Sequence, residues 1–369
     1  MSAPARVVAR TAPTLTVDLS AVAENTRRFV RAVPGEVMAV VKADGFGHGL
    51  AAVARTAVAN GATWLGVTSL AEGVAVRAAG VGEPVLSWLN PVEVDVATAA
   101  GHRIDLAVPS PRHLDAIVAA GHPMRVHLQL DTGMARDGAA PDEWSSLMAA
   151  ARRAEVAGRV TVVGIMGHLA MAGWPGHPAN SRGVDAFLRG VAMAEQSGLR
   201  PAVRHLAATA ATLTLPSAHL DMVRIGAGLV GIDPSDSTTL RQALRLTAPI
   251  AQVRRVAAGV GIGYDHTRVT CRPTTLALLP LGYADGLPRS ASGRAQVLVA
   301  GRRCPVVGLI SMDQTVVDVG ECPVEPGDEA VVFGPGDGEP TVDEWAAWAG
   351  TIPHEVMTGI GSRVSRSVR

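Results

Sequence analysis

The chain contains the stretch AVVKADGFGHG at residues 39–49, where an apolar run ends in a lysine and passes into a glycine-rich loop. The run Val37–Val41 does not alternate with polar residues, which is typical of a strand buried on both faces of a parallel sheet. Such a strand would place Lys42 at the edge of the sheet. We therefore predict a parallel sheet with Lys42 on the rim of an active site.

Lys42 is the only lysine among 33 Lys and Arg residues, so the other 32 are arginines. Both residue types supply positive charge, and charge alone does not explain the exception. A primary amine, unlike a guanidinium, can lose its proton near neutral pH and attack a carbonyl to form a Schiff base. We interpret Lys42 as a catalytic residue of this kind.

Similar apolar runs recur through the first two-thirds of the chain, separated by amphipathic segments. We find eight runs, at Val37–Ala43, Trp64–Ser69, Pro84–Leu89, Ile104–Pro109, Arg125–Leu130, Val162–His168, Val203–Ala207 and Met222–Ile225. Eight strand–helix units predict a (β/α)8 barrel. An open doubly wound sheet is the alternative fold, but it seldom needs eight units.

A second, mostly β domain is predicted after about Arg245, where helical periodicity fades and short β-like runs alternate with Gly, Pro and Asp turns. These runs are Ile250–Val256, Thr274–Leu279, Gln296–Val299, Thr315–Val319 and Glu329–Phe333. We predict a barrel at residues 12–245 and a β domain at residues 246–369. Residues 1–11 are expected to join the β domain, with a strand at Val7–Thr11.

The composition narrows the class of protein. The chain has 369 residues, 48% of them hydrophobic, and a formal net charge of zero, which argues against nucleic acid or an anionic membrane as the main partner. Apolar runs stay well below the ~18 residues that span a bilayer, and the N-terminus lacks the apolar segment of a signal peptide. Three cysteines without metal-ligand spacing predict neither disulfides nor a metal site. We expect a cytoplasmic, globular protein.

Polar side chains follow several predicted strands, at the end where barrels place their active sites. Besides Lys42, these strand ends present Asp131, Arg136, His168, His205, Thr209, Arg224, Gly226 and Ala227. Polar groups that converge from different strands opposite the sole lysine indicate a site rather than a scaffold.

Small residues after the eighth strand are typical of a phosphate-binding turn in barrels. A Schiff-base lysine together with such a turn predicts pyridoxal 5′-phosphate (PLP) as the cofactor, with Arg224 facing its ring nitrogen. Because a guanidinium does not readily give up a proton, the ring nitrogen would stay unprotonated and the cofactor would be a weaker electron sink. Such a site suits the simple removal and return of a proton at Cα.

Racemisation needs two proton-transfer groups, one on each face of Cα, and Lys42 can serve only one face. The chain has two tyrosines, Tyr264 and Tyr283, and both lie in glycine-bounded turns of the predicted β domain. We interpret them as functional residues. This requires the β domain to reach a barrel mouth, either within one chain or from a dimer partner.

Six ordered motifs across almost the whole chain resemble those of the alanine racemase family, the bacterial fold-type III PLP enzymes. They are AVVKADGFGHG (39–49), LDTGMARDG (130–138), VRIGAGLVG (223–231), GIGYDHT (261–267), LGYADG (281–286) and SMDQTVVDV (311–319). The resemblance implies a racemase that interconverts L- and D-alanine for D-alanine biosynthesis. It also implies a homodimer in which each active site is shared between the subunits.

The resemblance implies a role for each matching residue. Lys42 is expected to be the Schiff-base lysine and the base on the D-face, and Tyr264 the base on the L-face, from the other subunit. Arg136 is expected to touch the PLP phenolate oxygen and the substrate carboxylate, and Met312 and Tyr283 to contact the substrate. The remaining cofactor contacts are assigned to His168, Thr209, Arg224, Gly226, Ala227 and His354.

Several positions depart from the family pattern. Four of them replace a Tyr or Asn that the family usually has: Phe46, Ala208, Val230 and His354. Gln129 stands where many members have a lysine that becomes carbamylated; a glutamine can still accept a hydrogen bond from Arg136 but brings no charge. These changes leave open a different PLP-dependent enzyme on the same fold, either a racemase for another amino acid or a lyase of a specialised pathway.

A non-enzymatic PLP-binding barrel is a further alternative, against which the β domain and Tyr264 argue, because such proteins lack both. Fold-type III lyases that need zinc have a Cys or Asp two residues after a His. Here Val356 follows His354 at that spacing, so we predict no metal site.

Overall fold

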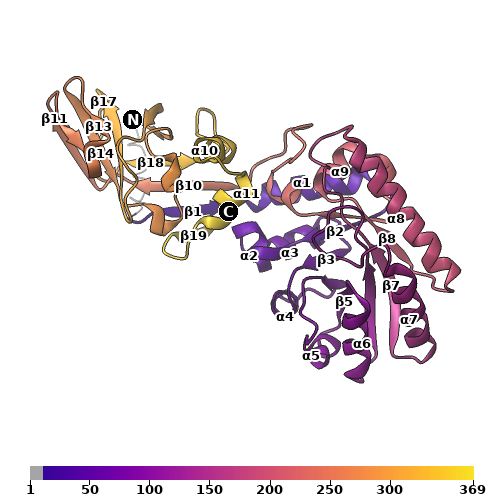
Figure 1. The fold of residues 1–369 in the computed structure, drawn as a ribbon. Helices are drawn as coiled ribbons and strands as arrows, with labels where there is room; N and C mark the ends of the chain where they lie inside the picture. The colour runs from indigo at the N-terminus through magenta and orange to yellow at the C-terminus, as the bar shows by residue number, and fades with distance from the viewer. Residues whose placement is uncertain (1–10) are drawn as a thin grey trace. The chain divides into compact units, whose positions relative to one another are not determined.

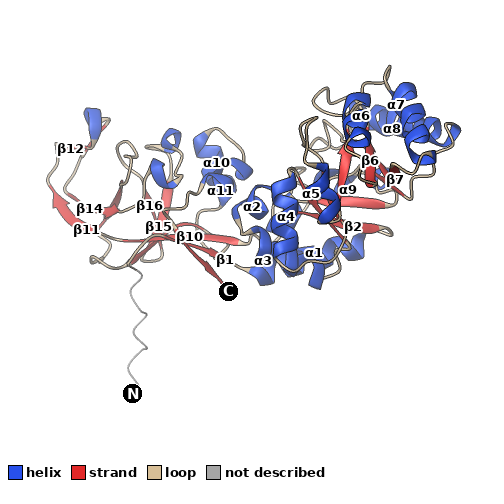
Figure 2. Ribbon diagram, turned by 90° about the horizontal axis from the view of Figure 1, so that it is seen from below, coloured by secondary structure: helices blue, strands red, loops and turns tan. Residues whose placement is uncertain are grey.

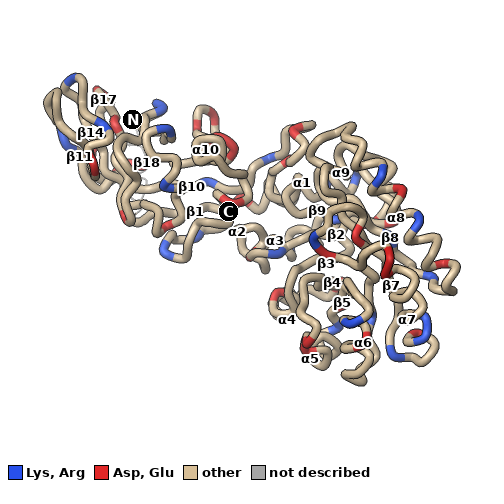
Figure 3. The backbone as a smooth tube through the Cα atoms, in the orientation of Figure 1, with Lys and Arg blue, Asp and Glu red and all other residues tan. Residues whose placement is uncertain are grey.

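The computed structural model describes residues 11–369, which form two compact units. One unit comprises Ala21–Arg241, and the other joins the preceding segment, up to Ser20, to Gln242–Arg369. Figure 1 shows strands accompanied by helices in the first unit and mostly strands in the second. Acidic and basic residues are interspersed along both units (Figure 3). Within residues 11–369, no helix has the length and apolar character needed to cross a bilayer.

The first unit is an eight-stranded parallel sheet that closes almost completely into a barrel, as predicted. Its strands are β2 (Glu36–Val40), β3 (Trp64–Val67), β4 (Val85–Ser87), β5 (Ile104–Val108), β6 (Met124–Gln129), β7 (Val160–Met166), β8 (Val203–His205) and β9 (Met222–Ile225). The order is β8-β7-β6-β5-β4-β3-β2-β9, and a bridge between Ala208 and Arg224 links the two end strands. Each of the eight predicted runs overlaps one of these strands.

Helices follow the strands and surround the barrel (Figure 2). They are α1 (Leu19–Ala32), α2 (Lys42–Gly47), α3 (Leu50–Ala59), α4 (Leu70–Ala78), α5 (Val96–Gly101), α6 (Pro111–Ala119), α7 (Trp144–Val156), α8 (Pro178–Gln196), α9 (Thr209–Thr214) and the 3-10 turns η1 (Pro216–Ala218) and η2 (Ala227–Val230). The strands are buried along most of their length, which explains why their sequences do not alternate.

The second unit is built on a six-stranded sheet in the order β16-β15-β18-β10-β1-β19 and a three-stranded sheet in the order β11-β14-β17. Its strands are β1 (Thr14–Val17), β10 (Leu244–Pro249), β11 (Gln252–Val256), β12 (Gly261–Ile262), β13 (Arg268–Val269), β14 (Thr274–Leu279), β15 (Gln296–Val299), β16 (Arg302–Pro305), β17 (Thr315–Gly320), β18 (Glu329–Phe333) and β19 (Ser365–Val368). Its helices are α10 (Val342–Ala349) and α11 (Pro353–Gly359), with the 3-10 turns η3 (Tyr264–His266), η4 (Tyr283–Asp285) and η5 (Arg289–Ala291).

The strand that joins the N-terminal segment to the β unit is β1. It pairs antiparallel with β10 and parallel with β19, so both ends of the chain contribute to one sheet. The strand predicted at Val7–Thr11 lies outside the described residues except for its last position, which is not in a strand. The predicted run Ile250–Val256 gives the single strand β11, because β10 ends before it at Pro249.

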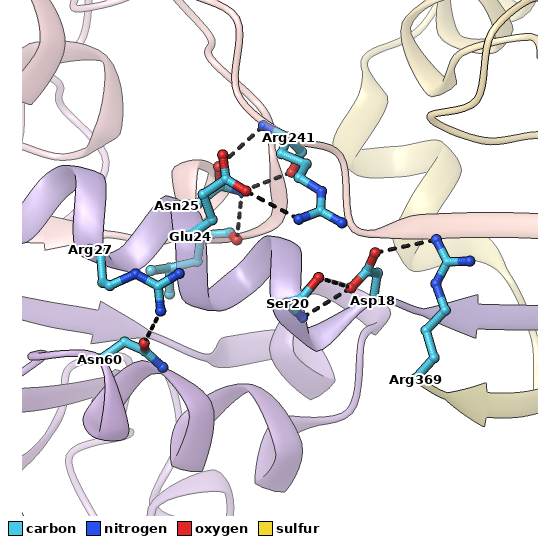
Figure 4. A network of polar contacts seen from close by, with 9 residues as sticks. Asp18, Ser20, Glu24, Asn25, Arg27, Asn60, Arg241 and Arg369 are labelled. Atoms are coloured by element: carbon cyan, nitrogen blue, oxygen red, sulfur yellow. Dashed lines mark hydrogen bonds and ion pairs between the residues drawn. The ribbon is translucent and has the colours of Figure 1, made fainter.

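Two polar networks fix the segments on which these units begin and end (Figure 4). In the β unit, the Asp18 carboxylate accepts hydrogen bonds from the amide and hydroxyl of Ser20, at 2.9 and 2.6 Å, and pairs with Arg369 at 3.2 Å. In the barrel unit, buried Asn25 of α1 donates to the carbonyls of Leu229 (3.2 Å) and Arg241 (2.8 Å). Asn25 thereby ties α1 to the turn that follows β9.

Gly35 allows β2 to begin beside β9, because a Cβ at Gly35 would lie 2.4 Å from the carbonyl oxygen of Asp221. Backbone cannot give way as a flexible side chain can, so we expect Gly35→Ala to lower the free energy of unfolding by ~1–3 kcal/mol. Gly82→Ala is the matched control, since a Cβ there meets no atom within 4 Å. Urea unfolding followed by circular dichroism measures both variants, and equal stabilities would contradict this packing.

Candidate active site

Lys42 lies just after β2, directly before a turn of left-handed backbone. Four successive residues, Ala43–Phe46, have φ between 51° and 61°. The strand therefore ends at Val40, earlier than the predicted Ala43. Left-handed backbone costs roughly 1–2 kcal/mol for each non-glycine residue, so contacts outside the turn must stabilise it. One such contact is the hydrogen bond of 2.8 Å from the Leu50 amide to Asp44 Oδ1.

Glu72 on α4 also holds this turn, and sequence reasoning missed it. Its Oε1 accepts a hydrogen bond from the Ala43 amide at 2.7 Å, and its Oε2 accepts from the amide and hydroxyl of Thr68, both at 2.9 Å. The same carboxylate completes a capping box with Ser69. The Ser-x-x-Glu spacing could have revealed the helix start. The contact with the Lys42 turn depends on the barrel, which brings β2 and β3 side by side.

The amine of Lys42 lies in an environment that favours its neutral form. Burial lowers the pKa of Lys42 most, the positive charge of Arg136 lowers it further, and Glu72 opposes these effects. A lowered pKa increases the fraction of neutral amine, which is the form that attacks a carbonyl. Burial and the charges of Arg224, Arg136 and Lys42 lower the pKa of His168 to about 3. These four predicted residues therefore lie together at one end of the barrel.

Arg224 is the buried cation of this group, with 4% of its surface exposed. Its Nη1 donates to the carbonyl oxygen of His205 at 2.8 Å and to His205 Nδ1 at 3.1 Å. Its Nη2 donates to the carbonyl oxygen of Gly167 at 2.6 Å and to His168 Nδ1 at 3.2 Å. Burial lowers the pKa of Arg224 to about 10, so the guanidinium remains charged at neutral pH. All these acceptors are neutral, and none of them cancels its charge.

The turn after β9 is a cradle of small residues beside Thr209. The Gly228 amide donates to Thr209 Oγ1 at 3.1 Å, which leaves the hydroxyl proton of Thr209 able to donate to a ligand. Within residues 11–369, the amides of Gly226 and Ala227 donate no hydrogen bond. A Cβ on Gly226 would lie 2.7 Å from the ring of Phe46, so the cradle has room only for glycine there. Unpaired amides and a hydroxyl suit an anion such as a phosphate.

The predicted residues of the β unit lie on its turns and its last helix. The Ala284 amide, next to Tyr283, donates to the carbonyl oxygen of Met312 at 2.9 Å, so these two loops are adjacent. Tyr264, Tyr283 and Met312 are 69%, 42% and 53% exposed. His354 is half-buried on α11. The two tyrosines are therefore not part of the core of the β unit.

The hydrogen bond that Gln129 could accept from Arg136 is not formed. Gln129 Oε1 is buried and has no hydrogen-bond partner among the described residues, whereas Arg136 is exposed. The Asp131 carboxylate accepts hydrogen bonds from the amides of Gly133 and Met134. These bonds stabilise a turn in the segment that joins Gln129 to Arg136. This turn, which the sequence motif alone did not specify, separates Arg136 from β6.

Two further polar residues, Asp105 and His127, were missed by sequence reasoning. Both are buried on barrel strands, and both are connected to Arg224 through His205. The available signal was that Asp105 is the one polar residue of IDLAV, and that His127 lies between the apolar Val126 and Leu128 of MRVHLQ.

Two family models match this chain, the N-terminal domain of alanine racemase over residues 17–234 and the C-terminal domain over residues 243–368. The chain belongs to the alanine racemase family. It is 45% identical over 359 residues to the alanine racemase of Thermobifida fusca, with 95% of this chain and 96% of the relative covered. The alanine racemase of Streptomyces coelicolor is 46% identical over 367 residues, with 95% and 94% covered.

Solved structures of alanine racemases have the same fold. The enzyme from D-cycloserine-producing Streptomyces lavendulae superimposes with a TM-score of 0.94 at 43% identity, over 98% of this chain and 97% of that chain. The Bacillus anthracis alanine racemase with bound L-Ala-P gives a TM-score of 0.89 at 31% identity, over 98% and 95%. These similarities confirm the predicted family.

Several histidines of this alanine racemase family member have lowered pKa values, and we therefore expect its free energy of unfolding to fall in mild acid. Burial lowers the pKa of His48 to about 4, and it also lowers the pKa values of His127, His168 and His205. Below the ordinary value near 6.5, the unfolded chain binds more protons than the folded chain, so stability falls as the pH decreases. Each such histidine contributes up to roughly 1.4 kcal/mol per pH unit between pH 6.5 and its folded pKa.

Urea unfolding at several pH values between 6.5 and 5 measures this dependence. In this interval most carboxylates remain ionised, so the slope reports on histidine. His48→Asn should flatten the slope, because Asn retains a donor for the Phe46 carbonyl and does not titrate. His102→Gln, at an exposed position, should leave it unchanged. A stability independent of pH across this interval would refute the prediction.

Proposed function

We propose that this chain is an alanine racemase that interconverts L- and D-alanine with PLP as its cofactor. Lys42 is the observation that best supports the proposal. It is the only lysine of the chain, and burial and Arg136 lower its pKa at the end of the barrel where Arg224 is buried. Membership of the alanine racemase family supports alanine as the substrate.

The residues at this end of the barrel fit PLP. The amides of Gly226 and Ala227 and the hydroxyl of Thr209 would hold the phosphate, and Arg224 would donate a hydrogen bond to the ring nitrogen. When bound through a lysine, this cofactor supplies an electron sink that makes the Cα–H bond of an amino acid acidic. Phe46 offers a ring against the cradle but no hydroxyl, so the phosphate would depend on the amides and Thr209.

Each proton-transfer step is assigned to a residue of this chain. The neutral amine of Lys42 would take and return the proton on the D-face, and the phenol of Tyr264 would do so on the L-face. Arg136 would hold the substrate carboxylate, and Met312 and Tyr283 would line the substrate pocket with His168 and His354. Because Arg224 remains a donor, it would leave the ring nitrogen unprotonated and favour simple proton return.

A homodimer is part of the proposal. Tyr264 and Met312 are 69% and 53% exposed in the single chain, and exposed side chains of this kind suit contact with a second copy. We propose that Tyr264 acts in the site of the partner subunit, and that the enzyme supplies D-alanine in the cytoplasm.

Replacing the only amine tests the role of Lys42. Lys42→Arg retains the positive charge but removes the group that can join a carbonyl, so we expect no racemisation and no visible absorbance from bound PLP. Arg200→Lys, an exposed exchange of the same two residue types, is the control and should retain both properties. Racemisation is followed by circular dichroism of alanine. Racemisation by Lys42→Arg at the wild-type rate would refute the assignment.

Removing one phenol tests the two-base arrangement. We expect Tyr264→Phe to slow Cα–H exchange from L-alanine by roughly 10²–10⁴-fold and exchange from D-alanine far less, since general-acid–base groups contribute on this scale. Deuterium uptake from D2O, measured by NMR with each enantiomer, gives both rates in the same preparation. Equal losses for the two enantiomers would argue against separate bases on the two faces.

A further inference from the structure

Arg224 is connected to the interior of the barrel by a chain of buried polar groups. Its Nη1 bonds His205 Nδ1 at 3.1 Å, and His205 Nε2 bonds His127 Nδ1 at 2.9 Å. His127 Nε2 then lies 3.5 Å from Asp105 Oδ2. Both imidazoles are fully buried, and Asp105 is 3% exposed. The groups come from β5, β6, β8 and β9, so this arrangement exists only in the folded barrel.

The direction of these hydrogen bonds follows from Arg224. A guanidinium has only donors, so His205 Nδ1 must accept and the proton of this imidazole must be on Nε2. His205 Nε2 therefore donates to His127 Nδ1, and the proton of His127 must also be on Nε2, where it faces Asp105. Burial lowers the pKa values of both histidines, so both rings are neutral at neutral pH. Each link thus fixes the tautomer of the next.

Gly164 provides the space for this chain of contacts. It lies on β7, between the strands of His127 and His205, and it pairs with His127 across the sheet. A Cβ at Gly164 would lie 2.2 Å from His127 Nδ1, the atom that bonds His205. Any other residue at this position would therefore displace the ring.

We propose that Asp105, His127 and His205 form a relay of fixed polarity that positions Arg224 and keeps it a hydrogen-bond donor toward the active site. In this relay His205 and His127 are positioning residues, and Asp105 is the anion at the end remote from Arg224. Arg125 pairs with Asp105 at 3.0 Å. The Arg125 side chain is half-exposed, so this ion pair connects the buried carboxylate to the surface of the barrel. The proposal deepens the proposed function, on which its catalytic consequence rests.

The tautomers of the two histidines are the decisive measurement, and they can be observed with and without PLP. The full chain is labelled with nitrogen-15 in histidine, and the ring nitrogen shifts are recorded by NMR and assigned with His127→Gln and His205→Gln. We expect both rings to be neutral with the proton on Nε2. A proton on Nδ1 of either ring would overturn the proposal. The tautomers are read from the wild-type chain, and the two variants serve only to assign its signals.

Asp105→Asn tests whether the relay transmits its effect to Arg224. We expect the nitrogen shifts to change at His127 and at His205, and kcat to fall roughly tenfold with KM within twofold, as for the loss of one charge-assisted contact. Asp221→Asn is the matched control: it removes the carboxylate that pairs with Arg204 at 2.7 Å in the same barrel, outside the relay. The control should leave the shifts of both rings and kcat unchanged.

The outcomes separate the relay from the proposed function. Nε2–H tautomers in a chain that neither binds PLP nor racemises alanine would support the relay and refute the function. An active racemase in which Asp105→Asn leaves the His205 signals unmoved would support the function and refute the relay. Equal losses of kcat in Asp105→Asn and Asp221→Asn would show that the carboxylate acts only through stability, and would overturn the relay.

Discussion

The structure depends on a guanidinium that is buried at one end of an apolar barrel without a carboxylate in contact. A buried charge is costly unless hydrogen bonds satisfy its donors. Arg224 is satisfied by the carbonyl oxygens of Gly167, Leu206 and His205 and by two imidazole nitrogens. Because these acceptors are neutral, the protein stabilises the cation without neutralising it. The same contacts fix the ends of β7, β8 and β9 relative to one another.

The electrostatics of Lys42 follow from this arrangement. Two arginines and a neutral histidine lie at the same end of the barrel, and Glu72 is the carboxylate that raises the pKa of Lys42. Its oxygens already accept hydrogen bonds from Ala43 and Thr68, so Glu72 is committed to holding the turn. The amine therefore lies in a partly buried site of net positive charge, in which its neutral form is favoured. The same carboxylate thus holds the left-handed turn and, as a negative charge, opposes the lowering of the pKa of Lys42.

The fold could be predicted because the strands of a barrel are buried on both faces, and continuous apolar runs follow directly from that burial. Lys42, His168 and Arg224 were predicted for a related reason, since polar residues at strand ends are conspicuous. The left-handed turn was not predictable, because Ala43 and Phe46 disfavour that backbone. Asp105 and His127 were missed since their partners lie on other strands, and only the closed barrel brings them together.

The β unit shows how exposed side chains can still have defined positions. Arg363 pairs with Asp285, next to the Tyr283 loop, at 3.1 Å and with Asp313, next to Met312, at 2.5 Å. Asp285 is buried, whereas the pair with Asp313 is exposed on both sides and contributes little by itself. The stronger constraint is at Gly286, where φ is 109° and an added Cβ would lie 2.2 Å from the carbonyl oxygen of Gly359. Backbone packing between this turn and α11 therefore fixes the loop, and the arginine then sets the spacing between its neighbours.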